Sequence, residues 1–186
     1  MGDNLEKLAD AELAKMALAN ESAFKLIISR YKDRLFYYLK RLTLLNGDDL
    51  EDILQQVFIK VYYNLNGFDP ELKFSSWIYR IAHNEAMNHF RRNRVQIVDI
   101  DKVILLDDLS DLENDMDRHL EQQVVQRVLA DLEPKYREVL SLKYFAEKNY
   151  QEISDILVKP AGTVATLINR AKKQFQDKYQ KYAGKN

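Results

Sequence analysis

The side chains that could carry out chemistry are few and poorly placed for catalysis. The 186-residue chain has no cysteine, which excludes disulfides and thiol catalysis. Its three histidines, His83, His89 and His119, lack the spacing of metal ligands, and no glycine-rich loop could cradle a phosphate. Carboxylates are numerous, but they lie on predicted solvated helix faces or in one acidic segment. We therefore expect no catalytic residue, no metal, no cofactor and no small-molecule substrate.

Two stretches carry side chains suited to nucleic acid, and the first is basic. Its amide and basic residues are opposed only by Glu85; they are Asn84, Asn88, His89, Arg91, Arg92 and Arg94. Amide side chains can hydrogen-bond base edges, and arginine can bind phosphates or guanine. Cations are also favoured at a helix C-terminus by the helix dipole, so a solvated helix end is the alternative, and the commoner case for this stretch alone.

In the second stretch, two helical patterns meet at Pro160 and Gly162. After Thr163, the predicted N-cap, an apolar stripe recurs at intervals of four, three and four: Val164, Ile168, Ala171 and Phe175. From residue 159 to 186, seven Lys or Arg residues face a single acid, Asp177. This layout is typical of a helix-turn-helix whose second helix enters the major groove, and an ordinary helical hairpin is the alternative.

The sequence pattern predicts that all the elements that position these residues are helices. The chain is 46% apolar, has only five glycines and three prolines, and shows almost no two-residue alternation. We expect helices over 5–19, 22–45, from a cap at Asp48 to Leu65, and from a cap at Ser75 or Ser76, with further helices from Leu120 and Pro134. Neither a signal peptide nor a membrane span is expected, which favours a cytoplasmic protein.

An acidic segment divides the chain. Between residues 99 and 121, nine acids accompany only Lys102 and Arg118 as cations. We therefore predict an all-α protein of two small domains, 1–95 and 119–186, joined by an acidic linker over 96–118. The apolar run Val103–Leu106 within the linker is either a docking segment or a small satellite of a core.

The order of these features resembles a bacterial RNA polymerase sigma factor of the extracytoplasmic-function (ECF) group of the sigma-70 family. Residues 48–62 look like the polymerase-binding helix of that family, 74–84 like its promoter-melting segment, and 84–92 like the segment that reads the minus-10 element. Residues 136–140 and 150–153, followed by Pro160, Gly162 and Thr163, look like the module that binds the minus-35 element. The resemblance covers nearly the whole chain.

The resemblance implies three sets of site residues. Those implied to bind polymerase are Asp48, Asp52, Gln55, Gln56 and Lys60. Those implied to contact the minus-10 element are Asn66, Phe68, Lys73, Arg80, Asn84, Asn88, Arg91 and Arg92. Those implied to contact the minus-35 element are Thr163, Ala165, Thr166, Asn169, Arg170 and Lys173. The implied partners are core RNA polymerase, promoter DNA and an anti-sigma factor, which could hold the protein at the inner membrane.

Some positions depart from the family pattern. Val158 stands where glycine is usual, and because a β-branched residue resists positive φ, we expect a turn that is reshaped or entered differently. Ala165 and Leu167 replace basic residues, and Asn88 replaces an Asp. Asn can pair with adenine, and alanine or threonine methyl groups can meet thymine, so we expect an A/T-leaning minus-35 contact. Arg170 either reaches a phosphate or braces its domain through Glu138 or Glu152.

Two other functions remain compatible with the sequence. A stand-alone helix-turn-helix regulator would bind a promoter duplex tightly without polymerase. A helical adaptor protein would use its basic patches on an acidic partner and would show no activity that depends on nucleic acid.

Overall fold

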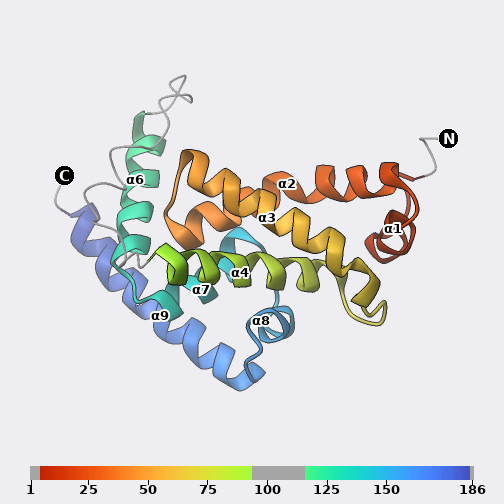
Figure 1. The fold of residues 1–186 in the computed structure, drawn as a ribbon. Coiled ribbons are helices and arrows are strands. Elements are labelled where there is room, and N and C mark those ends of the chain that lie inside the picture. Colours follow the sequence, from red (N-terminus) through yellow and green to blue (C-terminus); the bar gives the residue numbers. More distant parts are fainter. Residues whose placement is uncertain (1–4, 94–115, 185–186) are drawn as a thin grey trace.

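The structure is a computed structural model, and it describes residues 5–93 and 116–184. Its first half contains helices α1 (Asp10–Ala17), α2 (Glu21–Thr43), α3 (Gly47–Asn64) and α4 (Phe74–Asn93), with a short 3-10 turn, η1, at Leu65–Gly67 (Figure 1). Helices α2, α3 and α4 pack on one another, and α1 lies across α2. Each long helix buries one apolar stripe, as the spacing of its apolar residues requires.

Helix α1 is fixed to α2 by a polar cluster at its start. Asp10 accepts from the Arg30 guanidinium at 2.8 Å and from the Tyr31 hydroxyl at 2.5 Å. Asn20 then begins α2, because its side-chain oxygen accepts from the backbone N–H of Ser22 at 2.9 Å. These local bonds explain why the first predicted helix is a short one that ends at Ala17.

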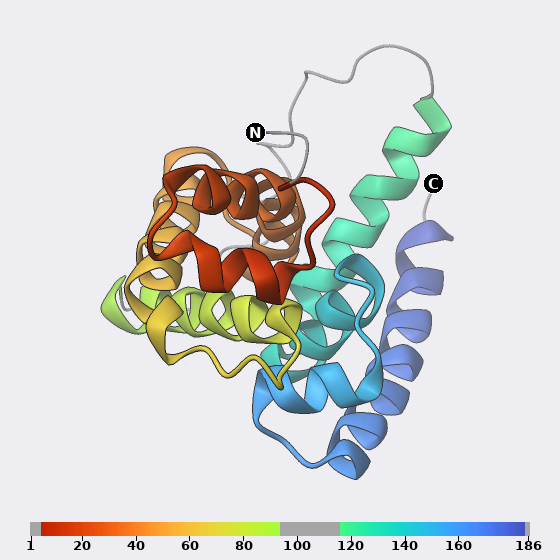
Figure 2. The ribbon, with the colours of Figure 1, turned by 90° about the vertical axis from the view of Figure 1, so that its right-hand side faces the viewer.

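The second half contains α6 (Met116–Asp131), α7 (Pro134–Leu140), the π-helical turn η3 (Ser141–Phe145), α8 (Tyr150–Leu157) and α9 (Ala161–Ala183). Helix α9 packs along α6, α7 and α8 (Figure 2). Near its end, Lys178 forms an ion pair with Asp131 of α6 at 2.6 Å, and Tyr182 donates to the same carboxylate at 3.2 Å. The lysine and these hydrogen bonds hold the pKa of Asp131 below its usual value.

The all-α prediction is confirmed, whereas several helix starts were predicted wrongly. Helix α3 begins at Gly47 rather than after a cap at Asp48, and α4 begins at Phe74 rather than at Ser75 or Ser76. Helix α9 begins at Ala161, and Pro160 supplies the carbonyl that accepts from the N–H of Thr163 at 2.9 Å. Thr163 therefore lies in the first turn. Pro160 can begin the helix without a side-chain cap, because the N–H that proline lacks has no hydrogen-bond partner at a helix start.

The turn between α8 and α9 holds Val158 at positive φ, contrary to expectation. Val158 adopts the left-handed conformation, with φ 53° and ψ 48°, and its N–H bonds to the carbonyl of Ser154. Ser154 Oγ also donates to the carbonyl of Lys159 at 2.5 Å, which closes the turn. The Val158 side chain is 69% exposed, so the strain of a branched residue at positive φ is tolerated without a steric clash in the core.

The two halves pack against each other through α4 on α8 and α2 on η3. Lys73, before α4, forms an ion pair with Glu152 of α8 at 3.2 Å, and Lys148 lies 4.3 Å from the centre of the Tyr79 ring. His83 of α4 lies 3.7 Å from Glu138 of α7. This is a closed arrangement of the two halves. The acidic segment that would join them, with Val103–Leu106, falls largely outside the described residues.

Candidate polymerase and promoter interfaces

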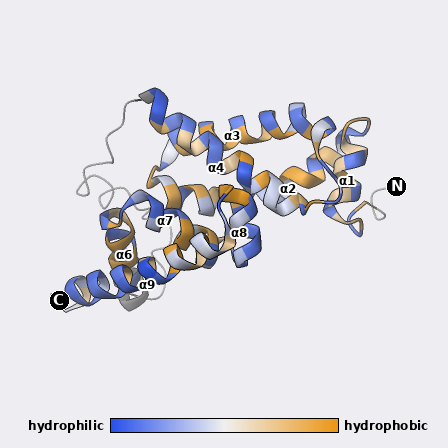
Figure 3. Ribbon diagram, turned by 90° about the horizontal axis from the view of Figure 1, so that it is seen from below, coloured by the Kyte–Doolittle hydropathy of each residue, from blue (hydrophilic) through white to orange (hydrophobic). Residues whose placement is uncertain are grey.

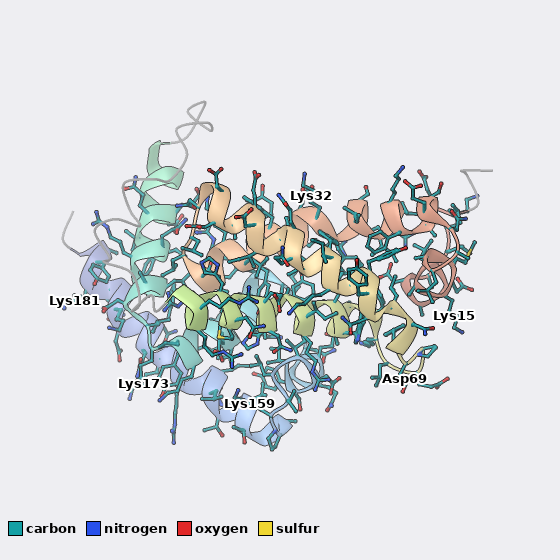
Figure 4. All side chains as sticks on the ribbon, viewed as in Figure 1. Lys15, Lys32, Asp69, Lys159, Lys173 and Lys181 are labelled. Atoms are coloured by element: carbon teal, nitrogen blue, oxygen red, sulfur yellow. The ribbon has the colours of Figure 1, made fainter. Side chains whose placement is uncertain are left out.

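Helix α9 has one buried and one exposed side, as predicted. Val164, Ile168 and Ala171 are fully buried, and Phe175 is half-buried beside them. The opposite side is polar and basic: Thr163, Thr166, Asn169, Arg170 and Lys173 are exposed, and Ala165 is half-buried. Figure 3 shows hydrophilic residues dominating the C-terminal part of α9. In Figure 4, Lys159, Lys173 and Lys181 lie along one edge of the molecule, with Lys173 projecting outward.

The elements before α9 fix the angle at which it leaves the body. Asn149 and Glu152 begin α8 with reciprocal bonds, each side chain accepting from the other's backbone N–H at 2.9 Å. The left-handed Val158 then turns the chain into α9. In the first turns of α9, Thr166 Oγ1 donates to the carbonyl of Gly162 at 2.9 Å, and the residue is exposed to solvent.

Arg170 does not take the bracing role that was one of its two alternatives. Its side chain is exposed. The ion-pair partners that the structure gives to Glu138 and Glu152 are His83 and Lys73. Arg170 thus stands on the same open face as Asn169 and Lys173, where a cation can reach a phosphate.

The second candidate face lies on α4. Asn84, Arg91 and Arg92 are exposed, and Arg80 and Asn88 are half-buried. The face is therefore narrower than the sequence predicts, because Asn88 uses its amide within the protein. Its Nδ2 donates to Glu85 at 2.9 Å, and its Oδ1 accepts from Arg91 Nη2 at 2.5 Å.

Glu85 is a residue that sequence reasoning missed. It was counted only as one acid opposing a basic stretch, yet it is 4% exposed and lies at the contact of α3 and α4. Its Oε1 accepts from Lys60 Nζ at 2.5 Å and from Asn88. A buried carboxylate requires such partners. The sequence gives little indication of this pairing, because Lys60 lies 25 residues before Glu85.

Two residues assigned to the minus-10 face have structural partners instead. Phe68 is 8% exposed, and its ring lies 5.2 Å from those of Phe74 and Trp77, so its assignment to DNA contact is a correction. Aromatic packing between η1 and α4 buries it. Lys73 is exposed but paired with Glu152, whereas Asn66 is exposed at η1.

The outer side of α3 carries the candidate polymerase contacts. Asp48, Asp52, Gln55 and Gln56 are exposed, while Lys60 is half-buried and paired with Glu85. Lys60 thus stands apart from the others. A polar hollow of about 440 Å³ lies between the outer parts of α3 and α4, and its lining residues are Asp49, Asp52, Ile53, Gln56, Glu85, His89 and Arg92. The hollow joins the acidic face of α3 to the basic face of α4.

The described parts of the chain contain neither a cluster of potential metal ligands nor a helix that could span a membrane. Over residues 5–93 and 116–184, no cluster of three or more His, Cys, Asp or Glu side chains could hold a metal ion. Among these same residues, no helix has the length and apolar character needed to span a bilayer.

Two family models match the chain, and they fall on its two halves. Sigma-70 region 2 matches residues 27–95, and Sigma-70, region 4 matches residues 122–175. The first match contains α4, and the second reaches residue 175 and so includes the first part of α9; these are the helices that bear the two candidate promoter faces.

Relatives of known function match over nearly the full length. The ECF RNA polymerase sigma factor SigW of Bacillus subtilis is 31% identical over 188 residues, which cover 93% of this chain and 100% of SigW. The ECF RNA polymerase sigma-E factor of Escherichia coli K12 is 30% identical over 186 residues, covering 94% of this chain and 96% of that protein.

Solved structures share the fold at lower identity. CnrH in complex with the cytosolic domain of CnrY superimposes with a TM-score of 0.70 and 21% identity, covering 90% of this chain and 95% of CnrH. The sigma factor RpoE in complex with the anti-sigma factor NepR from Bartonella quintana superimposes with a TM-score of 0.69 and 19% identity. This match covers 84% of this chain and 96% of RpoE. From the near-full-length relatives and both regional matches, the chain belongs to the ECF RNA polymerase sigma factors, transcription initiation factors that direct the polymerase to promoters.

Proposed function

We propose that this sigma factor reads the minus-35 element with α9 and the minus-10 element with α4, while the outer side of α3 binds core RNA polymerase. The observation that carries the proposal is the exposure and the charge of these three helix faces. Each of the three helices buries an apolar stripe and exposes a polar face, and the exposed α3 residues include acids whereas those of α9 include cations. The protein would select the promoter and assist strand opening, and it would perform no catalysis of its own.

The assignment of individual residues follows from exposure. For polymerase we propose Asp48, Asp52, Gln55 and Gln56, all of which are exposed on α3. For the minus-10 element we propose Asn84 as the base reader and Arg80, Arg91 and Arg92 as cations, with Asn66 at the edge of the face. For the minus-35 element we propose the exposed row Thr163, Thr166, Asn169, Arg170 and Lys173, together with the half-buried Ala165.

The closed arrangement must open before both promoter elements can be bound. Elements about 25 base pairs apart are separated by roughly 85 Å of straight duplex at 3.4 Å per base pair. In the structure α4 packs directly on α8, which immediately precedes α9. We therefore propose that residues 1–95 and 119–186 act as two domains, that the acidic segment 96–118 is the linker, and that polymerase holds the domains apart.

The regulatory partner and the compartment are part of the proposal. CnrH and RpoE, which share this fold, were solved with CnrY and with the anti-sigma factor NepR, respectively. We propose that an anti-sigma factor holds this cytoplasmic protein in its closed form, and an anchored one would keep it at the inner membrane.

Transcription in vitro tests the proposal directly. Core polymerase is combined with the full-length protein and a promoter library in which the minus-10 and minus-35 positions are randomised. We expect transcription only with both proteins present, and a selected motif at each element. Tight binding of a promoter duplex by the sigma factor alone, together with no stimulation of core polymerase, would overturn the proposal.

A further inference from the structure

A chain of hydrogen bonds crosses from α3 to the exposed face of α4. Lys60 of α3 donates to Glu85 Oε1 at 2.5 Å, and Asn88 Nδ2 donates to the same oxygen at 2.9 Å. Asn88 Oδ1 then accepts from Arg91 Nη2 at 2.5 Å. The buried Glu85 thus lies between a cation on one helix and an exposed arginine on another.

This chain fixes the direction of the Asn88 amide. An asparagine amide has a donor end and an acceptor end, and an ionised carboxylate only accepts. Glu85 therefore holds the NH₂ group inward, and the carbonyl oxygen faces Arg91. With one N–H and one lone pair already used inside the protein, Asn88 is less free than Asn84 to turn its amide toward adenine.

From this geometry we infer that Glu85 and Asn88 are positioning residues of the minus-10 face, and that they act by aiming Arg91 at the promoter backbone. The inference deepens the proposed function and rests on it. Charge-assisted bonds are directional, so an arginine held by a fixed acceptor keeps fewer orientations than a free one. Base reading on this face then belongs to Asn84, which is exposed and carries no such constraint.

The same geometry explains why asparagine suits position 88, where the family pattern has Asp. A carboxylate at that position would lie about 2.9 Å from Glu85 Oε1. Two carboxylates that close in a buried site repel each other strongly. The acid at 85 and the amide at 88 are therefore a matched pair.

The first experiment uses holoenzyme made from core polymerase and full-length protein, bound to a promoter duplex over a range of salt concentrations. Arg91→Ala should reduce the slope of log affinity against log salt by about one, the share of one phosphate contact. In an Asn88→Leu background the slope should already be reduced, and Arg91→Ala should change it little further. Arg92→Ala is the matched control, because its reduction should be equal in both backgrounds.

The second experiment needs neither polymerase nor DNA. Thermal unfolding is measured for Asn88→Asp, for Glu85→Gln and for the double variant. Asn88→Asp should lower Tm, and Glu85→Gln should largely restore it, because one carboxylate and one amide are again paired. Additive changes in Tm would show that the two side chains do not act together and would overturn the inference.

The two experiments separate the possible failures. If parent holoenzyme does not select a minus-10 element, the proposed function fails, and the unfolding cycle still decides whether Glu85 holds Asn88. If the unfolding cycle shows coupling but Arg91→Ala reduces the salt slope equally in both backgrounds, the pair is only structural. That result would overturn the positioning role.

Discussion

At the scale of single residues, exposure separates side chains that the sequence pattern groups together. Asn84 and Asn88 lie four positions apart in the same basic stretch, yet one is exposed and the other is held by Glu85. Phe68 was assigned to DNA, but it packs on Phe74 and Trp77. Such contacts join residues from different elements, so a local pattern carries little information about them.

Asn169 provides the first prediction at this scale. Asn169→Ala should relax base preference at the minus-35 element, because an asparagine paired with adenine contributes roughly 1–3 kcal/mol of discrimination. Binding of holoenzyme to duplexes randomised at this element, followed by sequencing, measures the preference. Lys173→Ala is the control, since the loss of a cation that contacts the DNA phosphates should weaken binding to all duplexes evenly. A G/C-rich motif that Asn169→Ala leaves unchanged would contradict the proposed readout.

Val158 provides the second prediction at the scale of single residues. Left-handed backbone costs a residue with a Cβ atom roughly 1–2 kcal/mol, and glycine is free of this cost. Val158→Gly should therefore raise the free energy of unfolding by about 1 kcal/mol, measured by chemical denaturation. Val158→Ala keeps the Cβ atom and should give a smaller change. An unchanged or lower stability in the glycine variant would show that the exposed valine contributes something other than strain.

At the scale of elements, the spacing of apolar residues predicted the buried helix faces better than capping residues predicted the helix starts. The apolar stripe predicted for α9 is buried as expected, because a packed helix must bury its apolar side. The helix starts at Gly47, Phe74 and Ala161 were missed. Pro160 begins α9 with a backbone carbonyl, and no side-chain rule identifies such a start.

Helix α3 carries the prediction for this scale. Asp52→Lys should weaken binding to core polymerase without loss of helicity, because Asp52 is exposed on the outer side of a helix whose inner side remains apolar. Competition for core polymerase against the labelled parent protein measures the change, and circular dichroism checks the helix. Asp177→Lys, an exposed reversal on α9, controls for net charge. Equal competition by the parent and Asp52→Lys would remove α3 from the polymerase interface.

At the scale of the whole molecule, the division into two helical halves follows from the sequence, but their closed contact does not. Lys73 and Glu152 are 79 residues apart, and nothing near either residue in the sequence indicates the pair. The aromatic partner of Lys148 is equally remote. Contacts between domains depend on surfaces that each domain forms only after folding, so the local patterns that predict helices do not reach them.

The closed contact yields the last prediction. Lys73→Glu would set two carboxylates against each other at the junction of α4 and α8, and the free protein should open. An exposed ion pair contributes about 0–1 kcal/mol, so its loss with added repulsion should raise the open fraction roughly three- to tenfold. Because the chain has no cysteine, Lys32→Cys and Lys181→Cys give two clean labelling positions for single-molecule energy transfer.

The matched control is Lys25→Glu, which makes the same charge change at an exposed pair with Glu21 inside α2. It should leave the distance distribution of the parent unchanged. Salt should open the parent protein, because it screens the Lys73–Glu152 attraction. In Lys73→Glu, salt should instead shift the protein toward the closed form, because only the new repulsion is left to screen. If Lys73→Glu and Lys25→Glu give the same distribution as the parent, the other contacts between the halves hold them together, and the ion pair has no part in closure.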